Sequence, residues 1–247
     1  MKIKTIILFM LWSAMLFAGQ IEIFGATATK HAMEELKNEF LKERPGDEIK
    51  FHTGSSGKAY TQFSSGMQYD MFFSADSKYP EQIVADGDAV TPSRVYAIGV
   101  LAFYSLDQKL IDEGIKAAAT DKIKKISIAN PKVAPYGIAA MEVLKNASLL
   151  EATQNKIVLG ENLSQAIHFV DSGAADIGII AFSLLKETNA PKGVYKLVDQ
   201  SLYTPLHQSF VITKYAKNKP LAQDFAHFVL SEKGQAILEK YGFRRAQ

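Results

Sequence analysis

Cysteine is absent from all 247 residues of the sequence. Disulfides, thiol catalysis, Cys-ligated metal sites and a lipid anchor on an N-terminal cysteine are therefore excluded. The five histidines, His31, His52, His168, His207 and His227, show no metal-ligand spacing, which disfavours a metal centre. The 47% hydrophobic content instead predicts that a large packed core holds the protein together.

A strong excess of charge of either sign is also missing. The formal net charge is +2, and Lys2 and Lys4 belong to an N-terminal segment that we expect to be removed. A nearly neutral chain lacks the electrostatic footprint of a nucleic-acid-binding protein or of a basic membrane surface. We therefore expect no nucleic-acid partner.

The apolar stretch near the N-terminus is short. Residues 6–17 are apolar apart from Ser13, two lysines precede them, and Ala18-Gly19 follows. Because a membrane span needs about 20 apolar residues, this pattern is typical of a secretory signal peptide rather than of an anchor. We predict a signal peptide over residues 1–18 and a periplasmic location for the mature protein.

Strand-like and helix-like patterns alternate along the rest of the chain. Residues 20–24 alternate as in a strand, and Ala32, Met33, Leu36 and Phe40 then fall on one helical face. This alternation predicts an α/β fold with mostly parallel sheets. No Pro/Gly-rich linker divides the chain, so any two lobes must be joined by structured crossings, for which residues 95–104 and 207–212 are candidates.

The turn at residues 54–58, Gly-Ser-Ser-Gly-Lys, is the most informative local feature. It follows a short strand at residues 49–51 and opens directly into a helical pattern. The first N–H groups of a helix have no internal partner, and the helix dipole adds partial positive charge there. With the hydroxyls of Ser55 and Ser56, this turn is suited to an anion that only accepts hydrogen bonds.

Other interpretations of this turn stay open. A single small-residue turn is more often a plain connection between strand and helix. Ser55 and Lys58 also have the Ser-x-x-Lys spacing of penicillin-binding proteins and β-lactamases, so a periplasmic Ser–Lys hydrolase is the enzyme alternative. No Ser-Asp-Asn or Lys-Thr-Gly follows, and His52 and Ala59 stand where a P-loop needs glycine and Ser/Thr.

Several further small-residue turns follow in a definite order, and together they resemble the periplasmic molybdate-binding proteins of ABC uptake systems. The segments that carry the resemblance are Phe24-Gly25-Ala26-Thr27-Ala28, Gly54-Ser55-Ser56-Gly57 with Gln62, Asp70-Met71-Phe72-Phe73-Ser74-Ala75-Asp76, Asn130-Pro131 with Pro135-Tyr136-Gly137, Gly160-Glu161-Asn162-Leu163, Gly173-Ala174-Ala175-Asp176-Ile177-Gly178 and Tyr241-Gly242-Phe243. The resemblance covers essentially the whole mature chain, and its strength lies in the number, order and spacing of these segments.

The resemblance implies a two-lobed periplasmic-binding-protein fold with the ligand in the cleft between the lobes. Each lobe would be a mostly parallel sheet flanked by helices, with lobe I over residues 19–98 and 204–247 and lobe II over residues 99–203. The protein would be a receptor and not an enzyme, would need no cofactor, and would act as a monomer that hands its ligand to an ABC permease.

The resemblance also implies a set of ligand-binding residues. Carried over position by position, they are Thr27, Ala28, Ser55, Ser56, Tyr136 and Leu163. Many relatives have Ser where this chain has Ala28, so Thr27 would supply that hydroxyl while Ala28 and Leu163 give backbone N–H groups. Some relatives have Tyr where this chain has Ala181, a loss that Tyr136 would offset.

Such a site offers only hydrogen-bond donors, which suits a tetrahedral dianion that carries no proton. Molybdate and tungstate meet this condition, whereas protonated phosphate would leave an unmatched polar pair. Sulfate is also free of protons, so only the size of the cavity separates sulfate from the larger molybdate and tungstate. A receptor for tungstate alone or for sulfate therefore remains an alternative. A ligand-sensing domain of a regulator is disfavoured by the signal peptide and by the lack of a DNA-binding module.

Overall fold

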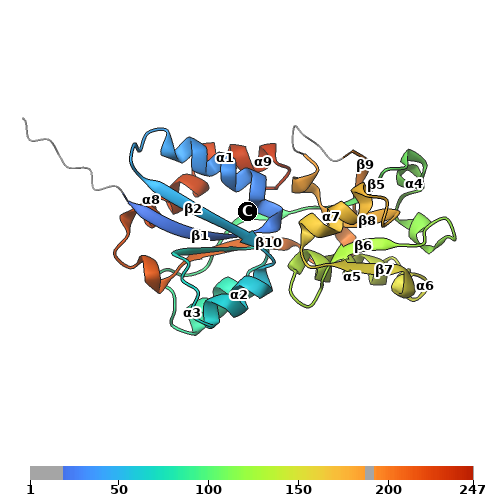
Figure 1. Cartoon of the computed structure of the whole chain (residues 1–247), viewed down its shortest axis with the longest axis horizontal. Coiled ribbons are helices and arrows are strands. Elements are labelled where there is room, and N and C mark those ends of the chain that lie inside the picture. Colours follow the sequence, from blue (N-terminus) through green and yellow to red (C-terminus); the bar gives the residue numbers. More distant parts are fainter. Residues whose placement is uncertain (1–18, 187–191, 247) are drawn as a thin grey trace, which may run out of the picture.

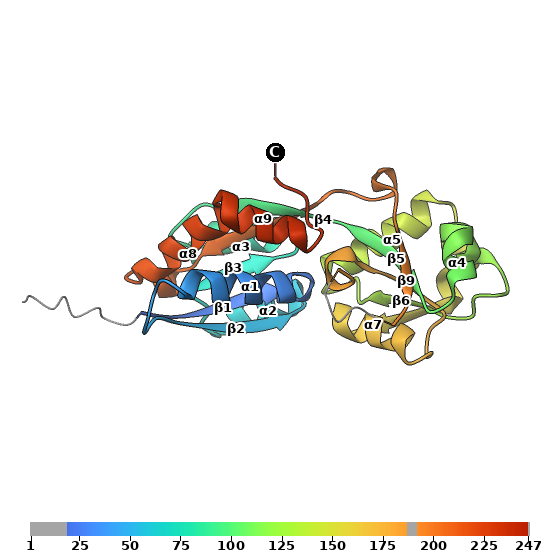
Figure 2. The same ribbon diagram turned by 90° about the horizontal axis from the view of Figure 1, so that it is seen from above.

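The computed structural model describes residues 19–186 and 192–246, and it contains two five-stranded sheets, each flanked by helices. The two units lie side by side along the long axis of the molecule (Figures 1 and 2). We call the unit around the first sheet the first lobe and the unit around the second sheet the second lobe. The predicted signal peptide, residues 1–18, lies outside the described residues.

The first sheet contains strands from both ends of the described chain. In spatial order its strands are β2 (Glu48–Gly54), β1 (Gln20–Ala26), β3 (Met71–Ser74), β10 (Leu206–Ile212) and β4 (Arg94–Gly99). The second sheet is built from the middle of the chain. In spatial order its strands are β7 (Ile157–Gly160), β6 (Ile126–Ala129), β8 (Ile177–Ala181), β5 (Leu101–Ser105) and β9 (Val194–Leu197).

Helices cover both sheets. Those of the first lobe are α1 (Lys30–Leu41), α2 (Ser56–Ser64), α3 (Lys78–Ala85), α8 (Pro220–Leu230) and α9 (Glu232–Lys240). Those of the second lobe are α4 (Gln108–Glu113), α5 (Pro135–Asn146), α6 (Leu150–Thr153) and α7 (Leu163–Asp171). Short 3₁₀ turns connect them: η1 (Thr27–Thr29), η2 (Gly114–Ala119), η3 (Gln154–Lys156), η4 (Phe182–Leu184), η5 (Gln200–Leu202) and η6 (Lys214–Ala216).

The α/β class with mostly parallel sheets, predicted from the sequence, is confirmed: in each sheet four strands run in one direction and a single strand runs against them. In the first sheet β10 runs antiparallel to β3 and β4, and in the second sheet β5 runs antiparallel to β8 and β9. Both β10 and β5 enter their lobe from the other lobe, so they begin at the cleft. They therefore run opposite to the strands that end there, such as the parallel β1, β2 and β3.

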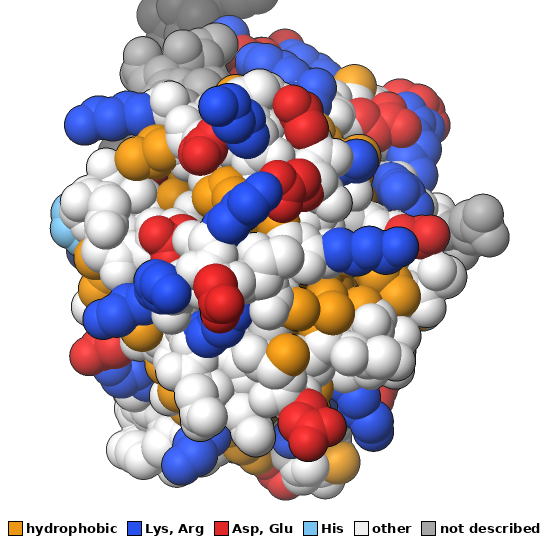
Figure 3. Space-filling model, turned by 90° about the vertical axis from the view of Figure 1, so that its right-hand side faces the viewer, with side chains coloured by type: hydrophobic (Ala, Val, Ile, Leu, Met, Phe, Trp, Pro, Cys, Tyr) orange, Lys and Arg blue, Asp and Glu red, His pale blue; other side chains and the backbone are white. Residues whose placement is uncertain are grey.

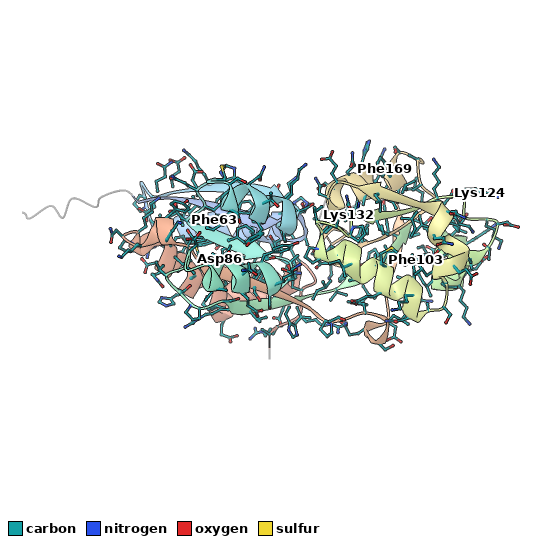
Figure 4. All side chains as sticks on the ribbon, turned by 90° about the horizontal axis from the view of Figure 1, so that it is seen from below. Phe63, Asp86, Phe103, Lys124, Lys132 and Phe169 are labelled. Atoms are coloured by element: carbon teal, nitrogen blue, oxygen red, sulfur yellow. The ribbon has the colours of Figure 1, made fainter. Side chains whose placement is uncertain are left out.

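Each lobe has its own core. Ile21 and Ile23 of β1 pack under α1 and α8, whereas Phe24 on the opposite face of the same strand packs with Phe63 of α2. Phe103 of β5 lies in the core of the second lobe, well away from Phe63 (Figure 4). The alternation along β1 thus buries both faces of the first sheet, as expected for a sheet with helices on both sides.

The chain crosses between the lobes twice. The first crossing is at Val100, between β4 of the first sheet and β5 of the second, and it divides the apolar run at residues 95–104. The second runs between β9 and β10, and Leu101 N–H donates to the Tyr203 hydroxyl at 3.1 Å, so the two crossings contact each other. The lobe boundaries at residues 98/99 and 203/204 stay a prediction.

None of the described helices combines the length and the apolar character needed to cross a membrane. Over the outer end of the second lobe, basic and acidic side chains are interspersed with small apolar patches (Figure 3).

Candidate functional site

A small cavity lies where the two lobes meet. It is partly open to solvent, and the space that the centre of a water molecule can occupy in it is about 10 Å³. The first-lobe wall consists of Ala26, Thr27, Ala28, Gly54, Ser55, Ser56 and Ala75, and the second-lobe wall consists of Ala134, Pro135, Tyr136 and Leu163. All six residues singled out from the sequence therefore line one cavity, although their roles toward a ligand stay a prediction.

The first turn follows the carboxyl end of β1. Thr27 is 5% exposed, and its hydroxyl has no hydrogen-bond partner within the described part of the chain. The Thr29 hydroxyl donates to the carbonyl of Ala26 at 2.8 Å, which closes the turn and starts the path into α1. Thr27 and Ala28 line the cavity, so the Thr27 hydroxyl and the N–H groups of the turn are candidate donors to a ligand there.

The second turn follows β2 and places two serines differently. The Ser56 hydroxyl accepts a hydrogen bond from the N–H of Ala75 at 3.0 Å, so its own hydrogen remains free to donate. Ser55 precedes the helix without capping it, and its hydroxyl donates to the carbonyl of Glu161 in the second lobe at 2.6 Å. Only Ser56 therefore keeps an uncommitted hydroxyl hydrogen.

The third element is the start of α5, which carries Tyr136. The Tyr136 hydroxyl accepts from the side-chain nitrogen of Gln208 at 3.1 Å, and burial raises the pKa of this phenol well above its ordinary value. Tyr136 therefore remains a donor at neutral pH. A Cβ on Gly99 would lie 2.2 Å from the Tyr136 hydroxyl, so only glycine leaves room for it there. A Cβ on Gly137 would lie 2.1 Å from the carbonyl oxygen of Ala129, so glycine also lets α5 approach β6.

The fourth element is the start of α7. The side chain of Asn162 accepts from the N–H of Gln165 at 3.1 Å, the usual bond of a helix N-cap. Leu163 is buried and opens the helix, so its N–H belongs to the first turn, where N–H groups have no partner inside the helix.

The electrostatics of the cavity come from dipoles and not from formal charges. No Lys, Arg, His, Asp or Glu is among the lining residues. Lys58 and Glu161, each two positions from a lining residue, pair with each other at 3.2 Å and are exposed. Asp76, which directly follows the lining residue Ala75, accepts from the Ser74 hydroxyl at 2.8 Å. Three α-helices, α2, α5 and α7, begin at the cavity, and the positive end of each helix dipole, equivalent to about half an elementary charge, favours an anion there.

The structure also places residues at the site that the sequence analysis missed. Ser183, just after β8, donates from its hydroxyl to the carbonyl of Ala28 at 2.7 Å, and Gln208 of β10 holds the Tyr136 hydroxyl. A polar residue inside the apolar strand β10 was a signal for Gln208, whereas nothing in the sequence marked Ser183. Ala181 is fully buried in β8 and is absent from the cavity wall.

The geometry does not assemble the catalytic pair of a Ser–Lys hydrolase. The hydroxyl hydrogen of Ser55 is directed to the Glu161 carbonyl, and the Lys58 ammonium pairs with the Glu161 carboxylate. The Lys58 side chain is 61% exposed, and its ammonium lies 3.2 Å from the Glu161 carboxylate. Within residues 19–186 and 192–246, no group of three or more His, Asp or Glu side chains is placed to hold a metal ion.

Comparison with known proteins places the chain in a family. The family model described as "Bacterial extracellular solute-binding protein" matches residues 21–244. The chain belongs to this family. Within the family, the molybdate-binding protein ModA of Azotobacter vinelandii is 32% identical over 228 residues, which cover 92% of this chain and 90% of that protein. ModA of Rhodobacter capsulatus is 34% identical over 202 residues, covering 81% of this chain and 79% of that protein.

A solved structure of the same family agrees with the fold. The periplasmic molybdate-binding protein of Azotobacter vinelandii superposes with a TM-score of 0.86 at 33% identity, covering 92% of this chain and 100% of that one. The resemblance and the two-lobed fold predicted from the sequence are thereby confirmed. These relatives are named as binding proteins rather than as enzymes.

Proposed function

We propose that this chain is the periplasmic solute receptor of a molybdate ABC transporter. It captures the oxyanion by closing its lobes and delivers it, as a monomer, to a permease in the inner membrane. The observation that carries the proposal is the interlobe cavity, whose wall supplies hydroxyls and helix N-termini from both lobes but no carboxylate, ammonium or imidazole. The names and coverage of the relatives support the same ligand.

The proposed ligand contacts come from both lobes. From the first lobe, the hydroxyls of Thr27 and Ser56 and the N–H of Ala28 donate to the oxyanion. From the second lobe, the Tyr136 hydroxyl and the Leu163 N–H do so. A ligand that contacts both walls binds the closed form more tightly than the open form, and this difference in affinity drives closure. Ser55 shares the cavity wall, with its hydroxyl already bonded across the cleft.

Selectivity follows from the absence of a carboxylate in the cavity wall. Molybdate and tungstate carry no proton at neutral pH, and each of their oxygens can accept from the donors around the cavity. Protonated phosphate would bury a donor with no carboxylate to receive it, at a cost of about 1–3 kcal/mol. We expect molybdate and tungstate to bind, and phosphate to be rejected. Sulfate is excluded only if the cavity closes less well around a smaller anion.

Calorimetric titration of the mature protein tests this function. We expect saturable binding of molybdate and of tungstate, and no heat of binding with phosphate. The Ser56→Ala variant loses a donor from the cavity and should bind molybdate more weakly, whereas Ser65→Ala, which removes a bond inside the first lobe from Ser65 to Thr61, should bind like the parent. Silence from all anions would reject the proposal, and binding of sulfate as tight as that of molybdate would reject the selectivity.

A further inference from the structure

The first turn of α2 is bonded to the second lobe on both sides of Ser56. On one side, the Ser55 hydroxyl donates to the Glu161 carbonyl at 2.6 Å. On the other side, the N–H of Gly57 donates to the carbonyl of Val133 at 2.9 Å. In the first lobe, Ser55 is 6% exposed and Ser56 is 1% exposed, so the first-lobe side of these contacts is buried, whereas Glu161 on the second-lobe side is exposed.

A matching bond lies at the first turn of the chain. The hydroxyl of Ser183 donates to the carbonyl of Ala28 at 2.7 Å, and both residues are buried. In each turn, the residue that bonds to the second lobe is the immediate neighbour of a proposed ligand hydroxyl. Ala28 is next to Thr27, and Ser55 is next to Ser56. Each first-lobe turn that supplies a proposed ligand hydroxyl is therefore fixed to the second lobe by a serine hydroxyl.

These bonds differ in kind from the ligand contacts proposed above. Both partners of each bond are protein atoms, one from each lobe, so each bond exists only when the lobes are closed. The hydrogens of Ser55 and Ser183 are directed to carbonyls, whereas those of Thr27 and Ser56 have no such acceptor. When the lobes open, the carbonyls of Glu161 and Ala28 lose the serine hydroxyls that donate to them. A dianion only accepts hydrogen bonds, so it cannot take the place of either donor.

We propose that Ser55 and Ser183 are positioning residues that latch the lobes shut and set the rate of ligand release, and that neither hydroxyl contacts the oxyanion. The predicted effect on the rate of ligand release rests on the proposed function, that is, on binding of molybdate in the cavity. The closed form is stabilised by the latch in addition to the ligand, so the lobes also close in the anion-free protein. Release of ligand then requires both hydroxyl bonds to break.

The latch depends on the two buried serines more than on the ion pair outside them. Lys58 and Glu161 are 61% and 70% exposed, and exposed pairs of this kind contribute little because water and salt screen them. In contrast, the Ser183 bond is buried and the Ser55 bond is partly buried, and removing either hydroxyl leaves a carbonyl without its donor. We expect loss of one serine hydroxyl to speed release about five-fold, and loss of both about 25-fold.

Release of radiolabelled molybdate into an excess of unlabelled molybdate measures this rate. Ser55→Ala, Ser183→Ala and the double variant should release faster by the factors above, and their association rate should rise as well, because a larger share of the anion-free protein is then open to the ligand. Ser65→Ala is the matched control, since its hydroxyl bonds to Thr61 within one lobe. Unchanged release from the double variant would overturn the latch.

Small-angle X-ray scattering in anion-free buffer separates a latch from a ligand contact. Loss of a latch should increase the radius of gyration of the double variant above that of the parent before any ligand is added. An unchanged radius of gyration together with weakened molybdate binding would overturn the proposal and make the serines ligand contacts. Because this measurement uses no ligand, it tests the latch even if the parent binds no molybdate, an outcome that would reject the proposed function separately.

Discussion

At the scale of single residues, the hydroxyls of the cavity are held by the bonds that they accept. Ser56 accepts from the N–H of Ala75, and Tyr136 accepts from Gln208. A hydroxyl that is fixed in this way retains its hydrogen for a further acceptor. The cavity therefore presents oriented donors without any formal positive charge.

Tyr136 gives the most direct test of this donor role. Replacing Tyr136 with phenylalanine removes the hydroxyl and keeps the ring, and a hydrogen bond to a charged acceptor is worth about 2 kcal/mol. We expect molybdate affinity to fall about 30-fold, measured by calorimetry. Tyr195→Phe is the control, because Tyr195 is 42% exposed on β9, away from the cavity wall. Equal affinities of both variants would show that the Tyr136 hydroxyl does not bind the ligand.

Buried tyrosines also predict how stability depends on pH. Burial raises the pKa of Tyr96, Tyr104 and Tyr136 above the ordinary value of 10.0. Above pH 10 the unfolded chain loses phenolic protons that the folded chain keeps, so the contribution to stability is complete below that pH and is lost as the pH rises further.

Urea denaturation between pH 8 and pH 11 measures this effect. The free energy of unfolding should stay level up to about pH 9 and fall above about pH 10. The fall should be shallower in Tyr136→Phe than in Tyr195→Phe, since only the first variant removes a buried phenol. An equally steep fall in both variants would contradict the linkage.

At the scale of elements, the helices that begin at the cleft were predictable from local sequence. Small residues after a short apolar strand predicted the turn before α2, Pro135 stands at the first position of α5, and Asn162 caps α7. Each signal acts within one turn of chain, through capping, a fixed φ angle or a missing N–H partner. These local rules do not require knowledge of the other lobe.

The features that the sequence did not predict depend on contacts between distant segments. The antiparallel placement of β5 and β10 is decided by the direction in which the chain enters each lobe. The bonds from Ser183 to Ala28 and from Gln208 to Tyr136 join residues that are 155 and 72 positions apart. No propensity or spacing in one segment specifies such partners, because they form only after the lobes dock.

Removing the N-cap of α7, and comparing the result with removal of another N-cap, separates an effect on stability from an effect on ligand binding. Asn162→Ala removes the side chain that accepts from Gln165, and should lower the free energy of unfolding by about 1 kcal/mol. Because the first turn of α7 lines the cavity, molybdate affinity should fall as well. The control is Asp107→Ala, since Asp107 caps α4 by accepting from the N–H of Lys109 at 2.8 Å, outside the cavity wall.

Thermal denaturation of both variants measures the loss of stability, and calorimetric titration measures their affinity for molybdate. Asp107→Ala should lose similar stability and keep its affinity. If Asn162→Ala also kept the affinity of the parent, the start of α7 would have no role in binding.

At the scale of the whole molecule, the site exists only where the two lobes meet. Val100 and the segment before β10 carry the chain across the cleft, and the carboxyl ends of β1, β2, β6 and β7 lead into the turns that line it. Ligands of open α/β sheets bind beyond the carboxyl ends of the strands, and here two such edges face each other. Neither lobe alone carries the full set of donors.

A crystal structure of the mature protein grown with molybdate, with diffraction data collected at the molybdenum absorption edge, would locate the bound anion. We expect one anomalous peak in the interlobe cavity, within hydrogen-bonding distance of Thr27 and Ser56 on one side and of Tyr136 and Leu163 on the other. A peak on the outer surface, or contacts from only one lobe, would contradict the account.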